Sequence, residues 1–174
     1  MSIDNLVFLL IIGALFVYVL QALIRSLRLV PARTEFIVER FGRYHKTLQA
    51  GFHFLIPFVD RVAFTKDLKE HTMDVPSQTC FTKDEIQVEV DGVIYLQVFD
   101  SQKASYGITD YQYAAIQLAQ TTTRAIIGTL DLDRTFEERE AISGKVVSVL
   151  DNAAMKWGVR ILRFEIKNLI PPES

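Results

Sequence analysis

An uncharged, apolar run opens the chain, from Leu6 to Ile24. Gln21 is its only strongly polar residue, so a helix over this run would be apolar on all sides. Such a helix would be roughly 28 Å long, close to the ~30 Å hydrocarbon core of a bilayer. The pattern predicts a short tail over residues 1–5 and a transmembrane helix over residues 6–24. The side chains expected to lie in lipid are Leu6, Phe8, Leu10, Ile12, Leu15, Phe16, Val19 and Leu23.

Two other interpretations of this run fit less well. A buried core helix would keep a polar face, and a cleaved signal peptide would begin with basic residues and end at a small-residue cleavage site. Asp4 is the only charged residue before the run, whereas Arg25, Arg28 and Arg33 follow it. The positive-inside rule therefore predicts an amino terminus outside the cell and a cytoplasmic location for the rest of the chain.

Strict alternation marks the clearest strand, Glu85 to Phe99, whose even positions are apolar and whose odd positions begin with acidic and amide side chains. Gly92 falls on the apolar face, where it indicates a bend or a close backbone approach. A second strand, Arg160 to Lys167, alternates likewise and should pair in the same sheet. Its expected core-facing side chains are Leu162, Phe164 and Ile166.

Shorter elements precede these strands. Thr34–Arg40 and Tyr44–Leu48 predict a hairpin whose turn uses Gly42. The stretch from Gly51 to Val59 is apolar and aromatic but too short to span a membrane. It either lies at the membrane interface or forms a buried strand and turn. The residues expected at the interface are Arg25, Arg28, Phe52, Phe54, Ile56 and Phe58.

Two helices are predicted between the strands. Thr109 and Gln112 have the spacing of a capping box before Tyr111–Ile127, which Gly128 should end. Thr135 and Glu138 repeat that spacing before a helix over residues 136–156, and its expected apolar stripe is Ile142, Val146, Val149, Leu150 and Ala153. Residues 25–174 should therefore form an α+β domain with a mainly antiparallel sheet and helices on one side. Its membrane-proximal part would cover about residues 30–95, and its second part about residues 96–172.

Composition adds exclusions rather than a chemistry. The net charge is −2, with 19 basic and 21 acidic residues and no basic stripe, so no nucleic acid partner is expected. Cys80 is the one cysteine, which excludes an intrachain disulfide. The histidines do not have the spacing of metal ligands, no G-x-S-x-G elbow occurs, and Ser143-Gly144-Lys145 lacks a phosphate-binding loop. We expect no catalytic residue, cofactor or metal.

The remaining charged residues suggest turns and contacts. Asp131 and Asp133 lie between the two helices and are best explained as turn and capping residues. The charge run from Glu137 to Glu140 is a solvated face or an intersubunit contact. The residues proposed for contact with a neighbouring copy are Arg134, Glu137, Glu138, Glu140, Arg160 and Arg163.

Several segments resemble the SPFH family of stomatins, prohibitins, flotillins and HflK/C proteins, most closely its bacterial stomatin-like (paraslipin) branch. They occur in family order from Val30 to Pro172 and are Val30–Val62, Met73–Gln78, Thr82–Asp84 with the strand through Val93, Thr123–Gly128, Glu138–Glu140 and Trp157–Val159. The resemblance implies an α+β domain beside the bacterial inner membrane, large homo-oligomeric rings or cages, organisation of membrane microdomains, and no enzymatic activity. It also implies regulation of membrane proteases, with an NfeD-type membrane protein or an FtsH-type protease as partner.

The chain departs from that pattern at three places. Ala50 and Ser101 stand where the branch usually has proline, and no heptad helix follows the proline pair at Pro171 and Pro172. We therefore expect a fragment of a longer protein. Two other functions stay open at this point, a monomeric membrane adaptor that docks a protease or channel and an anchored hydrolase.

Overall fold

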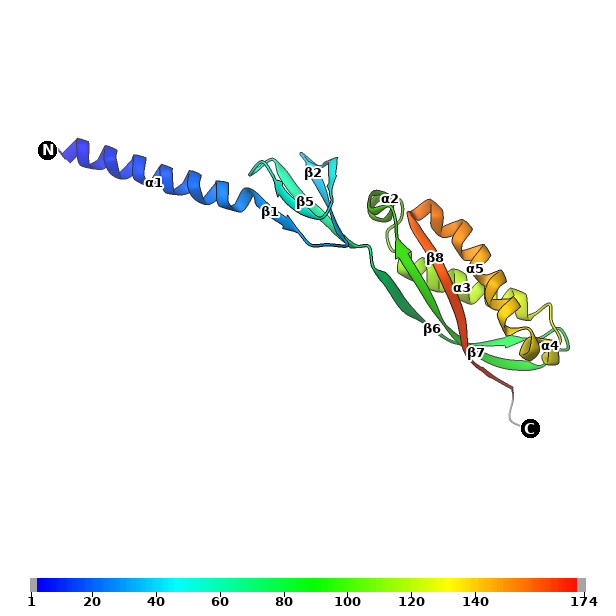
Figure 1. The fold of residues 1–174 in the computed structure, drawn as a ribbon. Helices are drawn as coiled ribbons and strands as arrows, with labels where there is room; N and C mark the ends of the chain where they lie inside the picture. The colour runs from blue at the N-terminus through cyan, green and yellow to red at the C-terminus, as the bar shows by residue number, and fades with distance from the viewer. Residues whose placement is uncertain (1–2, 172–174) are drawn as a thin grey trace. The chain divides into compact units, whose positions relative to one another are not determined.

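The computed structural model describes the backbone of residues 3–171 and the side chains of residues 11–24 and 26–171. The chain divides into two compact units, Met1–Asp67 and Leu68–Ser174 (Figure 1). The sequence predicted a boundary between two parts near residue 95. That position lies within a strand that pairs with residues 70–81, and both strands belong to the second unit. Each unit is described separately below.

The first unit consists of a helix and five short strands. The helix is α1 (Ile3–Ser26), and the strands are β1 (Leu27–Val30), β2 (Thr34–Arg40), β3 (Arg43–Leu48), β4 (Gly51–Phe54) and β5 (Asp60–Asp67). β1 and β4 form a two-stranded antiparallel ribbon, and the other strands form a sheet in the order β3-β2-β5. Among the described residues, no helix is long and apolar enough to cross a membrane, so the expected span over residues 6–24 is not confirmed.

The predicted hairpin is confirmed as β2 and β3, which pair antiparallel. Phe41 and Gly42 have φ angles of 51° and 76° at its turn, the left-handed region that glycine tolerates best. The unit's core is small, and its buried members are Val30, Val38, Leu48 and Leu55. The Gly51–Val59 stretch contributes Leu55 to that core and exposes most of its other large side chains.

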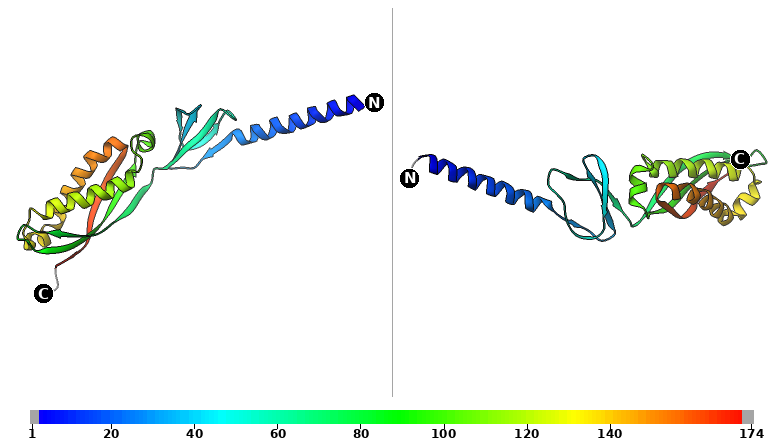
Figure 2. Two further views of the ribbon diagram at one scale, coloured as in Figure 1. Left: turned by 180° about the vertical axis from the view of Figure 1, so that it is seen from behind. Right: turned by 90° about the horizontal axis from the view of Figure 1, so that it is seen from above.

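The second unit is a three-stranded antiparallel sheet with helices on one face, in agreement with the predicted α+β fold. The strands are β6 (Glu70–Phe81), β7 (Gln87–Val98) and β8 (Val159–Ile170). The helices are α2 (Ser101–Tyr106), α3 (Tyr111–Ile127), α4 (Leu132–Glu137), α5 (Arg139–Ala154) and the 3-10 turn η1 (Met155–Trp157). Figure 2 shows α3 and α5 lying across the same face of the sheet.

β7 is the central strand, and its alternation is as predicted. Val88, Val90, Ile94, Leu96 and Val98 are all buried against the helices. Gly92 is the point of close approach on that face, since a Cβ atom there would lie 2.7 Å from the Glu165 carbonyl oxygen and 2.9 Å from the Phe164 ring. No larger residue fits at this crossing.

β8 pairs with β7 as expected, but its core-facing residues differ from those predicted. The pairing skips Leu162 and Lys167, and a skipped residue in each place shifts the alternation of the strand. Ile161, Phe164 and Leu169 are therefore buried, whereas Leu162 is exposed. The prediction that Leu162 faces the core is wrong.

The helix boundaries correct three further expectations. Asp110, not Thr109, caps α3, because its carboxylate accepts the N–H groups of Gln112 and Tyr113. The long helix expected over residues 136–156 is split at Glu138 into α4 and α5. Thr135 lies within α4 and donates its hydroxyl to the Asp131 carbonyl instead of capping a helix. The α5 stripe buries Ile142, Val146, Leu150 and Ala154, and Val149 is exposed.

Candidate functional site

The ribbon of β1 and β4 has one exposed apolar face. Leu27 pairs with Phe54 and Leu29 with Phe52, and paired residues in antiparallel strands share a face. These four side chains are 45–75 % exposed. The opposite face carries Arg28, paired with His53. The ribbon is therefore amphipathic, and its apolar face includes Phe52 and Phe54, whose contact with a membrane stays a prediction.

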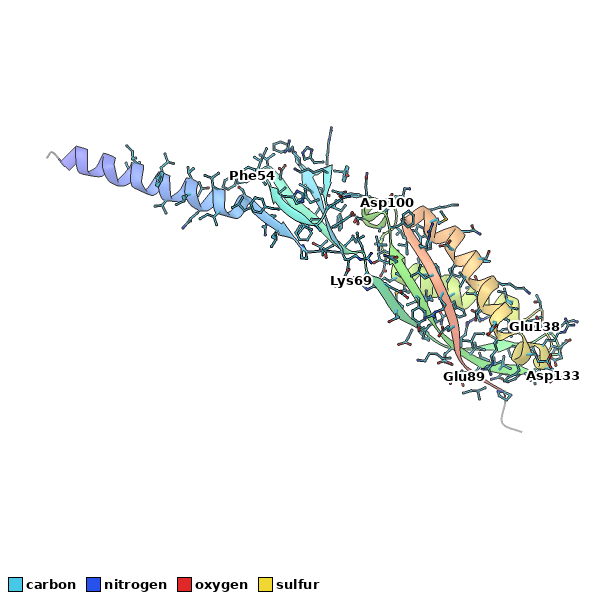
Figure 3. The ribbon with its side chains drawn as sticks, viewed as in Figure 1. Phe54, Lys69, Glu89, Asp100, Asp133 and Glu138 are labelled. Atoms are coloured by element: carbon cyan, nitrogen blue, oxygen red, sulfur yellow. The ribbon has the colours of Figure 1, made fainter. Side chains whose placement is uncertain are left out.

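The ribbon follows α1 without a linker. The Leu55 N–H donates to the Ser26 carbonyl over 2.9 Å, and the Ser26 hydroxyl donates to the Ala22 carbonyl over 2.8 Å. Ser26 itself is buried. These bonds join the last turn of α1 to the strand end at Phe54, which Figure 3 labels.

The loop after β4 adds two more exposed apolar side chains, Ile56 and Phe58. Phe58 has a φ of 66° and stacks on Tyr18 of α1, with ring centres 6.3 Å apart. Arg28 is exposed, and the side chain of Arg25 lies outside the described residues. The same holds for Leu6, Phe8 and Leu10, whereas the other residues expected in lipid, Ile12, Leu15, Phe16, Val19 and Leu23, are exposed.

An ion pair holds this loop in place. The Arg40 guanidinium donates to both carboxylate oxygens of Asp60, at 2.7 and 3.1 Å, and the Ile56 N–H donates to the same carboxylate at 3.0 Å. The Asp60 side chain is 1 % exposed. The hydrogen bond from Arg40 lowers the pKa of Asp60 to about 2. The carboxylate of Asp60 therefore stabilises the loop that carries Ile56 and Phe58.

The charged residues proposed for contact between copies lie in different places. Arg134 and Glu137 are exposed on α4, and Glu138 is half-buried at the break before α5. Figure 3 shows Glu138 and Asp133 at the same end of the unit. Arg160 lies on β8, and its guanidinium is 5.8 Å from the ring centre of Phe99, which follows β7.

Glu140 and Arg163 do line a common groove, between α5 and β8, with a volume of about 600 Å³. The lining residues from α5 are Arg139, Glu140, Ser143, Gly144 and Val147, and those from β8 are Leu162, Arg163, Phe164, Glu165 and Ile166. Arg163 bonds Glu165 over 3.0 Å and lies 4.2 Å from the Tyr95 ring centre. The groove was not predicted, because it depends on the skipped residue at Leu162.

The described residues contain no group of three or more metal-binding side chains. His53 uses its Nε2 atom in a 2.8 Å bond with the Gln49 carbonyl. Cys80 is buried, and that burial raises the pKa of its thiol. Asp131 stands at the N-cap position before α4, but its side chain makes no capping hydrogen bond.

Sequence comparison identifies the class of protein that carries these surfaces. Residues 28–174 match the SPFH domain / Band 7 family. The chain belongs to this family. It is 45 % identical over 144 residues to the mitochondrial stomatin-like protein 2 of Homo sapiens, an alignment that covers 82 % of this chain and 40 % of that protein. It is 40 % identical over 145 residues to stomatin-like protein stl-1 of Caenorhabditis elegans, covering 83 % and 45 %.

An uncharacterized protein of Methanocaldococcus jannaschii is 38 % identical over 171 residues, covering 98 % of this chain and 84 % of that protein. The chain spans about two fifths of the length of human stomatin-like protein 2. The recognition of an SPFH domain from sequence is confirmed. Its bacterial branch stays a prediction.

The motifs that carried the resemblance have structural contacts in this SPFH domain. Gln78 of β6 accepts a 2.6 Å bond from Arg124 and donates to the Gln120 carbonyl, which ties β6 to α3. The carboxylate of Asp84 bonds the Thr82 hydroxyl and accepts the Leu132 N–H. The hydrogen bond from Thr82 lowers the pKa of Asp84. These residues hold the β6–β7 turn to the start of α4.

Proposed function

We propose that this SPFH protein is a membrane-anchored, homo-oligomeric scaffold of the stomatin-like type. The observation that carries the proposal is the exposed apolar face of the ribbon, Leu27, Leu29, Phe52 and Phe54, directly after the apolar helix α1. Exposed apolar patches of this kind mark interaction surfaces, and aromatic side chains favour the headgroup region of a bilayer.

The anchor in this proposal is Leu6–Ile24. It includes Leu6, Phe8 and Leu10, whose side chains lie outside the described residues. The basic residues after the run favour an amino terminus outside the cell and an SPFH domain on the cytoplasmic face of a bacterial inner membrane. Arg28 lies on the polar face of the ribbon, opposite Leu27 and Leu29, where phosphate headgroups can be reached while the apolar face enters the lipid.

Assembly is the second part of the proposal. An anchored domain is confined to a plane at one height, and this raises its effective concentration for lateral contacts. Contacts of the head-to-tail kind close into rings, which would enclose lipid and membrane proteins. The clients we propose are a membrane protease of the FtsH type or an NfeD-type protein. No chemical reaction is required of the chain for this role.

Reconstitution of the full chain into lipid vesicles tests the proposal. We expect the protein to stay with the vesicles during alkaline carbonate extraction and, in mild detergent, to have a mass of many copies by light scattering. Release by carbonate would contradict the anchor. A single species at monomer mass would contradict the scaffold and favour a monomeric adaptor.

A further inference from the structure

The outer edge of β8 is open beside a groove. The sheet order is β6-β7-β8, so among the described residues no strand pairs with the outer side of β8. α5 borders this edge and forms the other wall of the groove. An open strand edge presents unpaired backbone N–H and C=O groups and therefore accepts another strand.

The groove also has apolar side chains and free space. Leu162, Val147 and Ile166 line it, and Leu162 is 41 % exposed. Gly144 lies in the middle of α5, and a Cβ atom placed there would meet nothing within 4 Å. Glycine within a helix costs about 1 kcal/mol relative to alanine, and no residue that the structure describes lies close enough to require it at this position. The space over Gly144 suits an incoming segment.

We propose that the β8 edge pairs antiparallel with β8 of a second copy, about a two-fold axis at Phe164. The proposal deepens the proposed scaffold function, because it assigns a contact that joins two copies into a pair, in addition to the head-to-tail contacts that would close a ring. A two-fold interface uses the same surface on both copies, so each residue meets the residue that is equally far from the axis on the other side.

Charge complementarity selects this partner and this register. With the axis at Phe164, Arg163 lies opposite Glu165 of the second copy, and Glu165 lies opposite Arg163. A shift of the axis by one residue position would place Arg163 opposite Arg163 or Glu165 opposite Glu165. A shift of the pairing by one residue would bring a buried side chain opposite an exposed one. An axis at Ile166 would also give two opposite-charge pairs, Glu165 with Lys167, but it would place the buried Phe164 opposite the exposed Asn168. Of these registers, the Phe164 register alone gives two opposite-charge pairs and keeps Phe164 opposite a buried side chain.

The apolar positions agree with the same register. Leu162 lies opposite Ile166 of the second copy, and both residues line the groove. Arg163 and Glu165 have side-chain exposures of 58 % and 51 %, so they are available to a partner as well as to each other. Each cross-strand pair of this kind contributes modestly, and the symmetry doubles every contribution.

A disulfide between two different variants tests the register in the full chain. One tagged copy carries Leu162→Cys and the other Ile166→Cys, and the two are mixed and oxidised in vesicles. Opposite residues in an antiparallel pair have Cα atoms roughly 4.5–5.5 Å apart, within the range of a disulfide. We expect a heterodimer disulfide in the mixture. Leu162→Cys alone should give none, since the two cysteines would lie roughly 13 Å apart along the strands.

Charge variants in this cysteine background test the pairing itself. Arg163→Glu in both copies, or Glu165→Arg in both copies, should lower the disulfide yield roughly tenfold. A mixture of an Arg163→Glu copy with a Glu165→Arg copy should restore it. In neither of those copies do positions 163 and 165 carry opposite charges, so recovery at these positions requires contact between copies.

The outcomes separate this inference from the proposed function. A high assembly mass without the disulfide, or without recovery in the mixture, overturns the β8 pairing and leaves the scaffold intact. A monomer mass for the native chain overturns both. A control without the two introduced cysteines, which retains only the buried Cys80, gives the background disulfide yield.

Discussion

Asp60 links acidity to the stability of the first unit. Its pKa of about 2 lies below the ordinary value of 3.8, so the folded state binds the proton less readily than the unfolded chain. The resulting stabilisation is complete above about pH 4 and is lost as the pH falls through 2. We expect Asp60→Asn to lower the melting temperature of this unit near neutral pH by about 4 °C or more.

The measurement is thermal unfolding of the full chain between pH 6 and pH 2. The difference between the native protein and Asp60→Asn should shrink across the acid range, because protonation removes the same interaction as the substitution. Asp133→Asn, at an exposed site on α4, serves as the control. A difference that stays constant down to pH 2 would contradict this role of Asp60.

Gly92 and Gly144 should respond in opposite ways to alanine. Gly92→Ala forces a Cβ atom against the Glu165 carbonyl and the Phe164 ring, and overpacking of this kind costs about 1–3 kcal/mol. Gly144→Ala adds a methyl group in open space on a helix and should stabilise the second unit by up to about 1 kcal/mol. Unfolding in denaturant measures both, and equal losses would contradict the close approach at Gly92.

Local sequence signals predicted the burial or capping role of some residues and not of others. The burial of Val88 and Ile94 could be predicted because alternation in β7 is uninterrupted on the helix-facing side. Leu162 could not be placed, because a skipped residue shows no sequence signal here and moves the alternation by one position. Thr109 and Asp110 are both good cap residues, and the backbone path, rather than residue type, decides between them.

At the scale of the element, the membrane contact proposed for the ribbon can be measured directly. Phe54→Trp in a Trp157→Phe background places a single tryptophan on the apolar face. We expect brominated lipids in vesicles to quench its fluorescence, because the side chain should lie at headgroup depth. Phe81→Trp is the matched control, since Phe81 is also exposed, at 60 % against 50 % for Phe54, but lies in β6. Equal quenching at both positions would contradict a specific contact of the ribbon.

Elements with a regular period were predictable, and irregular ones were not. The hairpin of β2 and β3 and the body of α3 follow directly from turn and helix signals. β6 gives no such signal, because Pro76 and a shift in register between Val75 and Gln78 interrupt it. For the ribbon, the aromatic segment that contains β4 was identified from the sequence, but the strand β1 was not. Leu27 and Leu29 alternate with Arg28, a period-two signal that indicates β1 as a strand but not its partner β4.

At the scale of the whole molecule, the division into two units depends on contacts that the sequence does not reveal. β6 pairs with β7 through residues 70–81 and 87–98, so the chain boundary lies before β6. Among the described residues, the second unit has a large buried cluster around Ile94 and Val146 and a smaller one around Val88, and the first unit has one small cluster around Val38. A unit with so few buried side chains is expected to be the less stable one.

Hydrogen exchange on the full chain in vesicles can show whether the units open separately. Val38→Ala removes buried methyl groups from the first unit and should destabilise it by about 2 kcal/mol. We expect faster exchange for the amides of β2 and β5 and unchanged exchange for β7, because local opening follows the unit in which the contacts are lost. Val146→Ala should produce the reverse pattern, with β2 unchanged. If either substitution accelerated exchange throughout both sheets, the two units would open together as one cooperative body.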